Sequence, residues 1–269
     1  MNSSKTSVEY SSAPPAQRLL AGRSRTGISA GSLHGMVVDR LGFLIASGEF
    51  RAGDLLPSAD ELCARLGVGR SVLREGIKVL SGKGMIEARP KTGTRVRPRA
   101  QWNHLDPDLL AWRYASPTGD DVASIFDLRR AIEPAAAALC ARRATPAQIA
   151  ELRALLEQME TVADDSERFA GPDLAFHQAV LPHAGNKLIA SLAGVVEMAL
   201  LISFRLSDDS GGQRHAMPQH RMVLERIEAR DDEGARAASM NLLNDAEKDV
   251  VRVLEQRRKR SARARKSGR

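Results

Sequence analysis

The sequence is poor in aromatic side chains, in cysteines and in long apolar runs, and each shortage narrows the class of protein. Aromatic residues make up only 4% of the 269 residues, so the composition favours helices, for which alanine and leucine are well suited. No apolar run reaches the roughly 18 residues of a membrane span, and the start lacks the pattern of a secretory signal. The two cysteines, Cys63 and Cys140, are far apart and are expected to be buried, reduced thiols. We therefore expect a cytoplasmic, mainly helical protein without membrane contact.

The net charge of +7 is distributed unevenly along the chain. Basic residues exceed acidic ones by 3 in residues 1–30, by 5 in residues 31–100 and by 8 in residues 257–269, whereas residues 101–256 carry a net charge of −9. A basic segment beside an acidic one is typical of a DNA-binding domain joined to a second domain. Solvated surface charge is the alternative explanation, above all for the C-terminal run.

The first domain carries the signals of a helix-turn-helix. Apolar residues at helical spacing predict a helix over 33–47. Ser58-Ala-Asp-Glu61 is a capping box, which starts a second helix that stops at Gly67. The turn Gly67-Val68-Gly69 then leads into a third helix over 70–81. Two short helices joined by so tight a turn form a helix-turn-helix.

A basic hairpin follows the helix-turn-helix. Met85–Arg89 and Thr94–Arg97 alternate in polarity and are separated by Pro90-Lys-Thr-Gly93, which predicts two short strands with a turn between them. The order of helix, helix-turn-helix and basic hairpin predicts a winged helix-turn-helix that binds double-stranded DNA. An unrelated small helical domain with a hairpin is the alternative.

The residues that read DNA are expected at the start of the third helix. Such a helix lies in the major groove with its N-terminal residues at the base edges, which here are Arg70, Ser71 and Arg74. The planar fork of arginine can bond guanine O6 and N7 together. Glu75 on the same helix could instead restrain an arginine.

Other basic residues of this domain are expected to contact phosphates. Arg65 and Lys78 are the candidates on the helices, and such contacts position the protein without specifying sequence. The tip of the hairpin, with Lys91, Thr92 and Gly93, would lie over the adjacent groove and backbone.

Beyond Ala100 the pattern is almost wholly helical and predicts an antiparallel helical bundle with short connections. No strand pattern of any length is present there. The expected helices cover Pro107–Ala115, Asp120–Arg143, Pro146–Ala163, Ser166–Leu181, Lys187–Ser207, Pro218–Arg230 and Asp232 to about Gln256. The fold class is thus mainly α, with an N-terminal winged helix-turn-helix and a C-terminal all-α bundle.

Three residues of the bundle could bind a metal ion. Asp173 and His177 are four residues apart on one helix and can share one ion, and His220, expected to open a later helix, could supply a third ligand. One carboxylate and two imidazoles suit Zn, Ni, Fe or Mn. The alternative is an ordinary helix pair beside a surface histidine.

An arginine in the interior could bind an anion. Arg129 and Glu133 are four residues apart on what should be an inward face, and an inward arginine needs a partner. Either the two form a structural ion pair, or Arg129 clamps a carboxylate in a cavity. Arg205, after a largely apolar helix, is a second candidate.

The first domain resembles the GntR family of bacterial regulators. The resemblance rests on residues 33–97, in particular on Pro57-Ser58-x-x-Glu61-Leu62, Leu66-Gly67-Val68-Gly69-Arg70-Ser71-x-x-Arg74-Glu75 and Gly84-Met85-Ile86-Glu87. It implies that Arg70 and Arg74 contact the operator and that the wing tip enters the minor groove. Gly69 departs from the pattern, because the family usually has a Ser or Thr there that bonds a phosphate; the Gly69 amide could replace that contact.

The second domain resembles the effector domain of the FadR subgroup, over about residues 120–250. The segments that carry this resemblance are Asp127–Ala137, Asp173-Leu-Ala-Phe-His177, Gly185-Asn186 and the helix after His220. It implies a bundle of six or seven helices around one effector cavity, with Asn186 among the effector contacts. Many members add a third histidine near Leu243, which this chain lacks, so a bound effector could complete the metal's coordination.

A narrower resemblance, in Trp102-Asn103-x-Leu105-Asp106-Pro107-Asp108, is to the branch of regulators that repress galactonate operons. It implies a sugar-acid effector such as an aldonate. We therefore expect a homodimeric repressor, or else an activator or dual regulator that senses a different organic acid. A metal-dependent enzyme and an architectural DNA-binding protein are the rivals from other classes. The expected domains are a disordered leader (1–30), the DNA-binding domain (31–99), a linker (100–118), the effector-binding and dimerisation domain (119–256) and a basic disordered tail (257–269).

Overall fold

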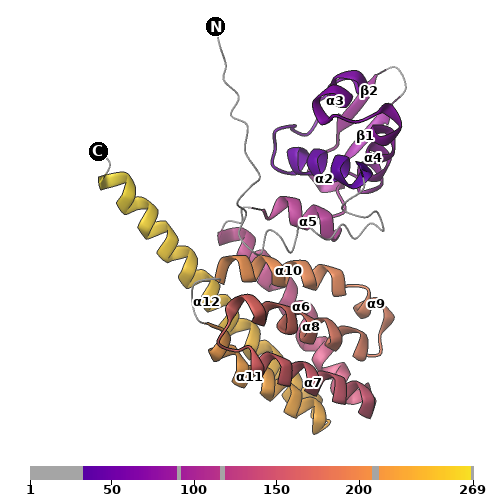
Figure 1. Ribbon diagram of the computed structural model, residues 1–269. Coiled ribbons are helices and arrows are strands. Elements are labelled where there is room, and N and C mark those ends of the chain that lie inside the picture. Colours follow the sequence, from indigo (N-terminus) through magenta and orange to yellow (C-terminus); the bar gives the residue numbers. More distant parts are fainter. Residues whose placement is uncertain (1–32, 90–91, 116–118, 208–211, 268–269) are drawn as a thin grey trace.

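A computed structural model describes residues 33–89, 92–115, 119–207 and 212–267 (Figure 1). Figure 1 shows a small N-terminal unit that contains a two-stranded sheet and a larger bundle of helices, with helix α5 between them. The leader expected over residues 1–30 lies outside the described residues.

The N-terminal unit consists of α2 (Leu33–Ala46), α3 (Ala59–Leu66), α4 (Arg70–Gly82), β1 (Ile86–Arg89) and β2 (Gly93–Val96). A 3-10 turn (Arg99–Gln101) and α5 (Pro107–Arg113) follow. The bundle consists of α6 (Gly119–Arg143), α7 (Pro146–Thr161), α8 (Ser166–His183), α9 (Lys187–Ala190), α10 (Ala193–Ser207), α11 (Gly212–Glu228) and α12 (Asp232–Ser267). The mainly α fold class with one small wing is confirmed.

The helix-turn-helix forms because its local signals agree. The Ser58 hydroxyl accepts a hydrogen bond from the backbone N–H of Glu61, whose carboxylate accepts one from the backbone N–H of Ser58, so the predicted capping box starts α3. Gly67 ends α3 at a φ of 67°, in the left-handed region that favours glycine. The apolar faces that the two helices bury consist of Leu62, Leu66, Leu73 and Leu80. Cys63 is only half-buried, whereas Cys140 in the bundle is buried as expected.

The predicted wing is present as an antiparallel pair of strands. Ile86 lies opposite Val96 and Arg89 opposite Gly93. Ile86 and Val96 are each 1% exposed, so the inner end of the wing belongs to the core of the N-terminal unit. The outer end of the wing extends away from that core (Figure 1).

Helix α5 is shared between two hydrophobic cores. Leu109 and Trp112 pack into the core of the N-terminal unit, whereas Leu110 and Ala111 pack against the core of the bundle. Gly42 of α2 makes the first contact possible, because a Cβ atom at that position would lie 2.5 Å from a ring carbon of Trp112. The described part of the expected linker is therefore an ordered connection between the two units.

The bundle differs from the predicted helices in three places. The single helix expected over Lys187–Ser207 is two helices, α9 and α10, and the Ser191 hydroxyl donates to the Leu188 carbonyl at the end of α9. Helix α11 begins at Gly212 rather than at Pro218, so His220 lies inside it instead of opening it. Proline lacks the N–H of a helical hydrogen bond, and its usual place at a helix start led to the wrong boundary.

The third difference concerns the tail expected to be disordered. Residues 257–267 continue α12 as a helix. Alanine, arginine and lysine are strong helix formers, and cations are favoured at the C-terminal end of a helix. None of the helices in the described ranges has the length and apolar character needed to cross a membrane.

Candidate DNA-binding surface and metal centre

The first turn of α4 presents the predicted base-reading residues to solvent. Arg70, Ser71 and Arg74 are exposed, and the side chains of the two arginines are accessible to 77% and 73%. Nη2 of Arg70 lies 2.6 Å from Oδ1 of Asp60, but an ion pair this exposed is worth little and is readily exchanged for another anion. Gly69 precedes the helix without a side-chain cap, as its lack of a hydroxyl requires.

Glu75 restrains its lysine neighbour more closely than its arginine neighbour. It lies 2.9 Å from Nζ of Lys78 and 3.8 Å from Nε of Arg74. The hydrogen bond from Lys78 holds the pKa of Glu75 below its usual value. Of Arg74 and Lys78, Arg74 is therefore the one that Glu75 restrains less.

The other predicted phosphate contacts lie around α4. Arg65 is exposed at the end of α3 and pairs with Glu49 at 2.8 Å. Thr92 and Gly93 are exposed at the outer end of the wing. Lys91 lies outside the described residues.

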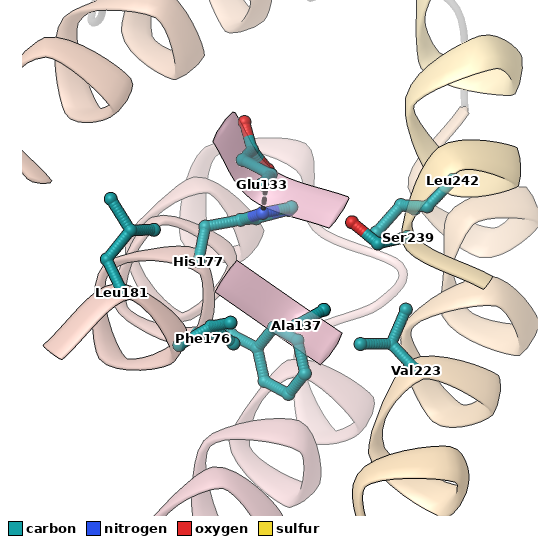
Figure 2. Close-up of a pocket in the computed structure, with 9 residues that line it drawn as sticks. Glu133, Ala137, Phe176, His177, Leu181, Val223, Ser239 and Leu242 are labelled. Atoms are coloured by element: carbon teal, nitrogen blue, oxygen red, sulfur yellow. Dashed lines mark ion pairs between the residues drawn. The ribbon is translucent and has the colours of Figure 1, made fainter. Parts of the chain in front are cut away.

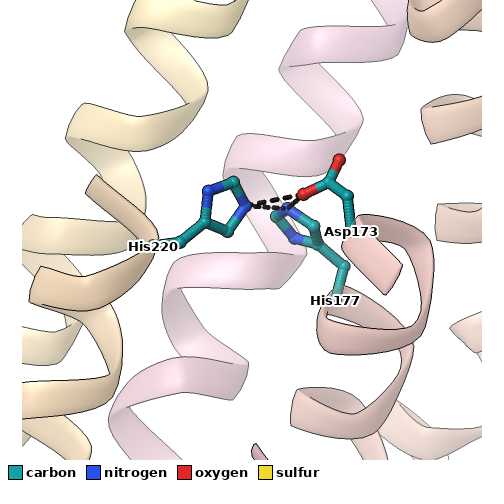
Figure 3. Close-up of side chains that lie close together, drawn as sticks. All are labelled: Asp173, His177 and His220. Carbon is teal, nitrogen blue, oxygen red and sulfur yellow. Dashed lines mark hydrogen bonds and ion pairs between the residues drawn. The ribbon is translucent and has the colours of Figure 1, made fainter. Parts of the chain in front are cut away.

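The bundle brings the three predicted metal ligands together. Asp173 and His177 lie on α8 and His220 on α11, and their exposures are 5%, 7% and 2%. One ligand atom from each belongs to a group whose members all lie within 4.8 Å of one another. Oδ1 of Asp173 lies 2.7 Å from Nε2 of His220, and the two Nε2 atoms are 3.2 Å apart (Figure 3).

The outer nitrogens of both imidazoles have acceptors. Nδ1–H of His220 donates to the carbonyl oxygen of Ala216 at 2.8 Å, and Nδ1–H of His177 donates to Oε2 of Glu133 at 2.7 Å (Figure 2). A neutral histidine that carries its proton on Nδ1 presents a lone pair at Nε2. Two Nε2 lone pairs and Oδ1 of Asp173 thus converge.

This convergence fits a metal ion. Oδ1 of Asp173 is buried and has no hydrogen-bond donor among the described residues, because the Nε2 atom nearest to it bears no proton in that tautomer. Lone pairs at such a distance repel one another unless a cation lies between them. The two imidazoles and the carboxylate are a donor set that suits Zn, Ni, Fe or Mn.

The two buried carboxylates at this centre have lowered pKa values. Burial raises the pKa of Asp173, but His220 and His177 when they are protonated, together with Arg129, outweigh it and hold that pKa below its usual value; beside neutral imidazoles a bound metal ion would supply that positive charge instead. Burial also raises the pKa of Glu133, yet Arg129 and His177 lower it to about 2. A metal ligand must be deprotonated, and so must an acceptor that orients a ligand, so both groups are in the required state.

Arg129 is committed to an ion pair. It is 2% exposed, and its Nε atom lies 2.6 Å from Oε1 of Glu133. Of the two alternatives that the sequence leaves open, the structural pair is therefore present. Glu133 also holds His177, a role that sequence reasoning missed because nothing in the sequence connects two residues so far apart.

The cavity beside these residues is small. Its volume is about 10 Å³, which is about the space of one water molecule, whereas pockets for small molecules usually exceed about 300 Å³. Figure 2 shows Glu133 and His177 on one side of it and Ser239 of α12 on the other. The remaining lining residues are Ala137, Phe176, Val180, Leu181, Val223 and Leu242. This cavity therefore has room for about one water molecule beside His177.

The other predicted effector contacts have different outcomes. The side chain of Asn186 accepts hydrogen bonds from the N–H groups of Leu188 and Ile189 and caps α9, so it has a structural role. Arg205 lies on α10, but its side chain lies outside the description. Leu243, where a fourth ligand was considered, is fully buried.

A second buried charge cluster lies where the N-terminal unit meets α5. Lys83 ends α4 and is 6% exposed, and its Nζ atom lies 2.7 Å from Asp106 and 2.8 Å from Asp108. Asp106 also accepts hydrogen bonds from the N–H groups of Asp108 and Leu109 and so starts α5. Sequence reasoning missed the cluster, although two aspartates around a proline are a recognisable helix start.

Comparison with known families identifies the class of protein. Residues 33–96 match the family described as bacterial regulatory proteins, gntR family, and residues 124–245 match the FCD domain. The repressor NanR of Salmonella newport is 30% identical over 230 residues, which span 83% of this chain and 88% of NanR. The chain belongs to the GntR family. It is therefore a DNA-binding transcriptional regulator with an FCD domain.

A second curated relative agrees with this class, and a solved structure agrees with the fold. The galactonate operon transcriptional repressor of Escherichia coli K12 is 28% identical over 210 residues, 77% of this chain and 92% of that protein. The structure of Lar, which controls the expression of the Listeria monocytogenes agr system, covers 82% of this chain and 97% of its own, with a TM-score of 0.60 and 17% identity, and so shows the fold alone. The two curated relatives are named as repressors and not as enzymes, which leaves the enzyme hypothesis without support.

Proposed function

We propose that this GntR regulator is a homodimeric repressor that releases a palindromic operator when a sugar acid or a related carboxylate binds to its FCD domain. The observation that carries the proposal is the convergence of Asp173, His177 and His220 on one buried point. Two relatives named as repressors, one of them of a galactonate operon, support the direction of regulation and the class of effector.

Arg70 and Arg74 would read the operator. Both are exposed on the first turn of α4, and the pair that each makes with a neighbouring acid is exposed as well. One short recognition helix reads few bases, so two copies on a palindrome are needed for useful affinity. Arg65, Thr92 and Gly93 would fix the position on the backbone and in the adjacent groove.

The metal would be held by Asp173, His177 and His220 and would supply a Lewis acid for carboxylate and hydroxyl oxygens. Glu133 and the Ala216 carbonyl orient the two imidazoles. Because Arg129 is already paired with Glu133, the metal is a better first partner for an anion than Arg129. The charge of the metal ion would favour an acid over a neutral sugar.

An effector that binds beside His177 would require the surrounding helices to move apart. The cavity beside His177, of about 10 Å³, is too small for a sugar acid, so an effector that enters there would have to widen it. A ligand that binds only the widened form shifts the equilibrium towards it. Helix α10 contacts α5, and α5 is tied to α4 through Lys83, so a movement of the bundle can reach the recognition helix.

The test is operator binding by the metal-loaded full chain. An operator selected from random duplexes is titrated with protein in the presence of galactonate, gluconate, galactose or octanoate. We expect a sugar acid to weaken binding by at least about tenfold and the neutral sugar to have no effect. His220→Ala should abolish the response, whereas His183→Ala, a buried histidine outside the centre, should keep it. Operator binding that no carboxylate changes would overturn the proposal.

A further inference from the structure

The C-terminal end of α12 leaves the bundle as a projecting helix (Figure 1). Val250 and Val253 are buried at 2% and 4%, and Leu254 packs partly against the same cluster. From Glu255 onward every side chain that the structure describes is exposed. The backbone stays helical to Ser267, so about 20 Å of helix extends beyond the bundle at about 1.5 Å per residue.

The projecting segment is almost purely cationic. Residues 257–267 hold seven arginines and lysines, two alanines and two serines. Like charges three or four residues apart destabilise a helix, so a partner that neutralises them stabilises this one. The acidic charge of the chain lies elsewhere, in residues 101–256. The partner of this segment should therefore be a polyanion.

The base of the projecting segment is firmly held. Helix α12 packs along α6 and α11, and Arg130 of α6 pairs with Glu247 of α12 at 2.6 Å. The basic segment is thus presented in a fixed direction. Figure 1 shows its end rising from the bundle to the level of the N-terminal unit, which carries the DNA-reading helix.

We propose that residues 257–267 form a second DNA contact, which binds the phosphate backbone of duplex beside the operator. The segment has no leucine, phenylalanine or tryptophan, so it lacks the apolar face of a membrane-surface helix and the apolar core of a protein interface. Two copies of it repel each other. DNA is already held by the same chain, which raises its effective concentration at the helix.

This contact adds affinity without adding sequence preference. Cations at four consecutive positions, 257–260, cover more than one full turn of a helix and so favour no single face. Such a segment neutralises phosphates and releases counterions, and each neutralised phosphate adds about 0.9 to the slope of log affinity against log salt. The proposal rests on the DNA binding of the GntR family and does not depend on the effector or the metal.

The test compares two duplexes and two variants of the full chain, without effector. One duplex ends at the operator, and the other carries about two further helical turns on each side. In the neutral variant the seven cations become glutamine: Arg257→Gln, Arg258→Gln, Lys259→Gln, Arg260→Gln, Arg263→Gln, Arg265→Gln and Lys266→Gln. The charge-matched control replaces only the five arginines by lysine.

We expect the wild type and the charge-matched control to bind the long duplex about tenfold or more tightly than the short one at about 50 mM salt. The neutral variant should bind both duplexes alike, with short-duplex affinity unchanged and a shallower salt slope. Equal affinity of the wild type for the two duplexes would overturn the proposal. An equal loss of the neutral variant's affinity for both duplexes would also overturn it. So would a neutral variant that binds both duplexes as the wild type does but no longer binds phosphatidylserine vesicles.

Discussion

Nζ of Lys83, at the end of the recognition helix, lies 2.7 Å from Oδ2 of Asp106, the residue that starts α5. The two side chains are 6% and 16% exposed, so the pair is shielded from salt. Because α5 packs into the cores of both units, this pair links the bundle to the DNA-reading helix through α5.

Removal of Lys83 tests this connection. We expect Lys83→Met to lower the free energy of unfolding of the N-terminal unit by about 3 kcal/mol, because Asp106 and Asp108 remain as carboxylates without a cation. The only tryptophans, Trp102 and Trp112, both lie in that core, so their fluorescence during urea unfolding reports on it. Lys78→Met removes an exposed pair and should change the value by less than about 0.5 kcal/mol. Equal effects of the two substitutions would contradict the account.

A second substitution tests the packing of α5 against α2. The Cβ of Gly42→Ala would lie 2.5 Å from the ring of Trp112, so α5 must shift. We expect a loss of about 1–3 kcal/mol in stability and an operator affinity that responds less to effector, with metal content unchanged. Gly82→Ala is the control, since no atom lies within 4 Å of its Cβ. A Gly42→Ala protein that behaves like the control would show that the contact is unimportant.

Glu133, which accepts the hydrogen bond from Nδ1–H of His177, should set the affinity of the site for metal. Glu133→Gln keeps the size of the side chain but weakens its acceptor, and we expect metal binding to weaken about 10–100-fold in a competition titration with a chelator. Glu151→Gln is the matched control, because Glu151 pairs with His183 at 3.1 Å outside the centre. Since Glu133→Gln also leaves Arg129 without its partner, an unfolding curve must show that the protein is folded. Unchanged affinity in a folded Glu133→Gln protein would argue against a metal at this point.

The recognition helix makes a separate prediction. Arg70→Ala and Arg74→Ala should each reduce the preference for operator over random duplex by about 1–3 kcal/mol, measured by competition anisotropy. Lys78→Ala should weaken binding to both duplexes alike and reduce the salt slope by about 1. If an arginine variant lost affinity for operator and random duplex in equal measure, the replaced arginine would be a phosphate contact instead.

The sequence predicted most of the fold because the decisive signals are local. The capping box Ser58–Glu61 and the glycine at Gly67 act within a few residues, and both are present as predicted. The sequence predictions of helix boundaries were wrong where contacts with the rest of the fold outweighed a local sequence rule. Pro218 was expected at a helix start but lies within α11, and the basic C-terminal residues were expected to be disordered but extend a helix that the bundle already holds.

The site could be predicted in part. The spacing of Asp173 and His177 placed two candidate metal ligands on one face, and the structure brings His220 to them. The link from Glu133 to His177 and the link from Lys83 to Asp106 join residues on different elements, so only the fold reveals them. The small cavity beside His177 likewise depends on side chains from several helices, which no pattern along the chain encodes.

One measurement tests the central claim most directly: the change in operator dissociation constant on addition of a sugar acid, before and after removal of metal by a chelator. The account predicts that the sugar acid weakens binding by at least about tenfold in the metal-loaded protein and has no effect after chelation, with the response restored by metal. A sugar acid that acts equally well on the metal-free protein, or on His220→Ala, would contradict it.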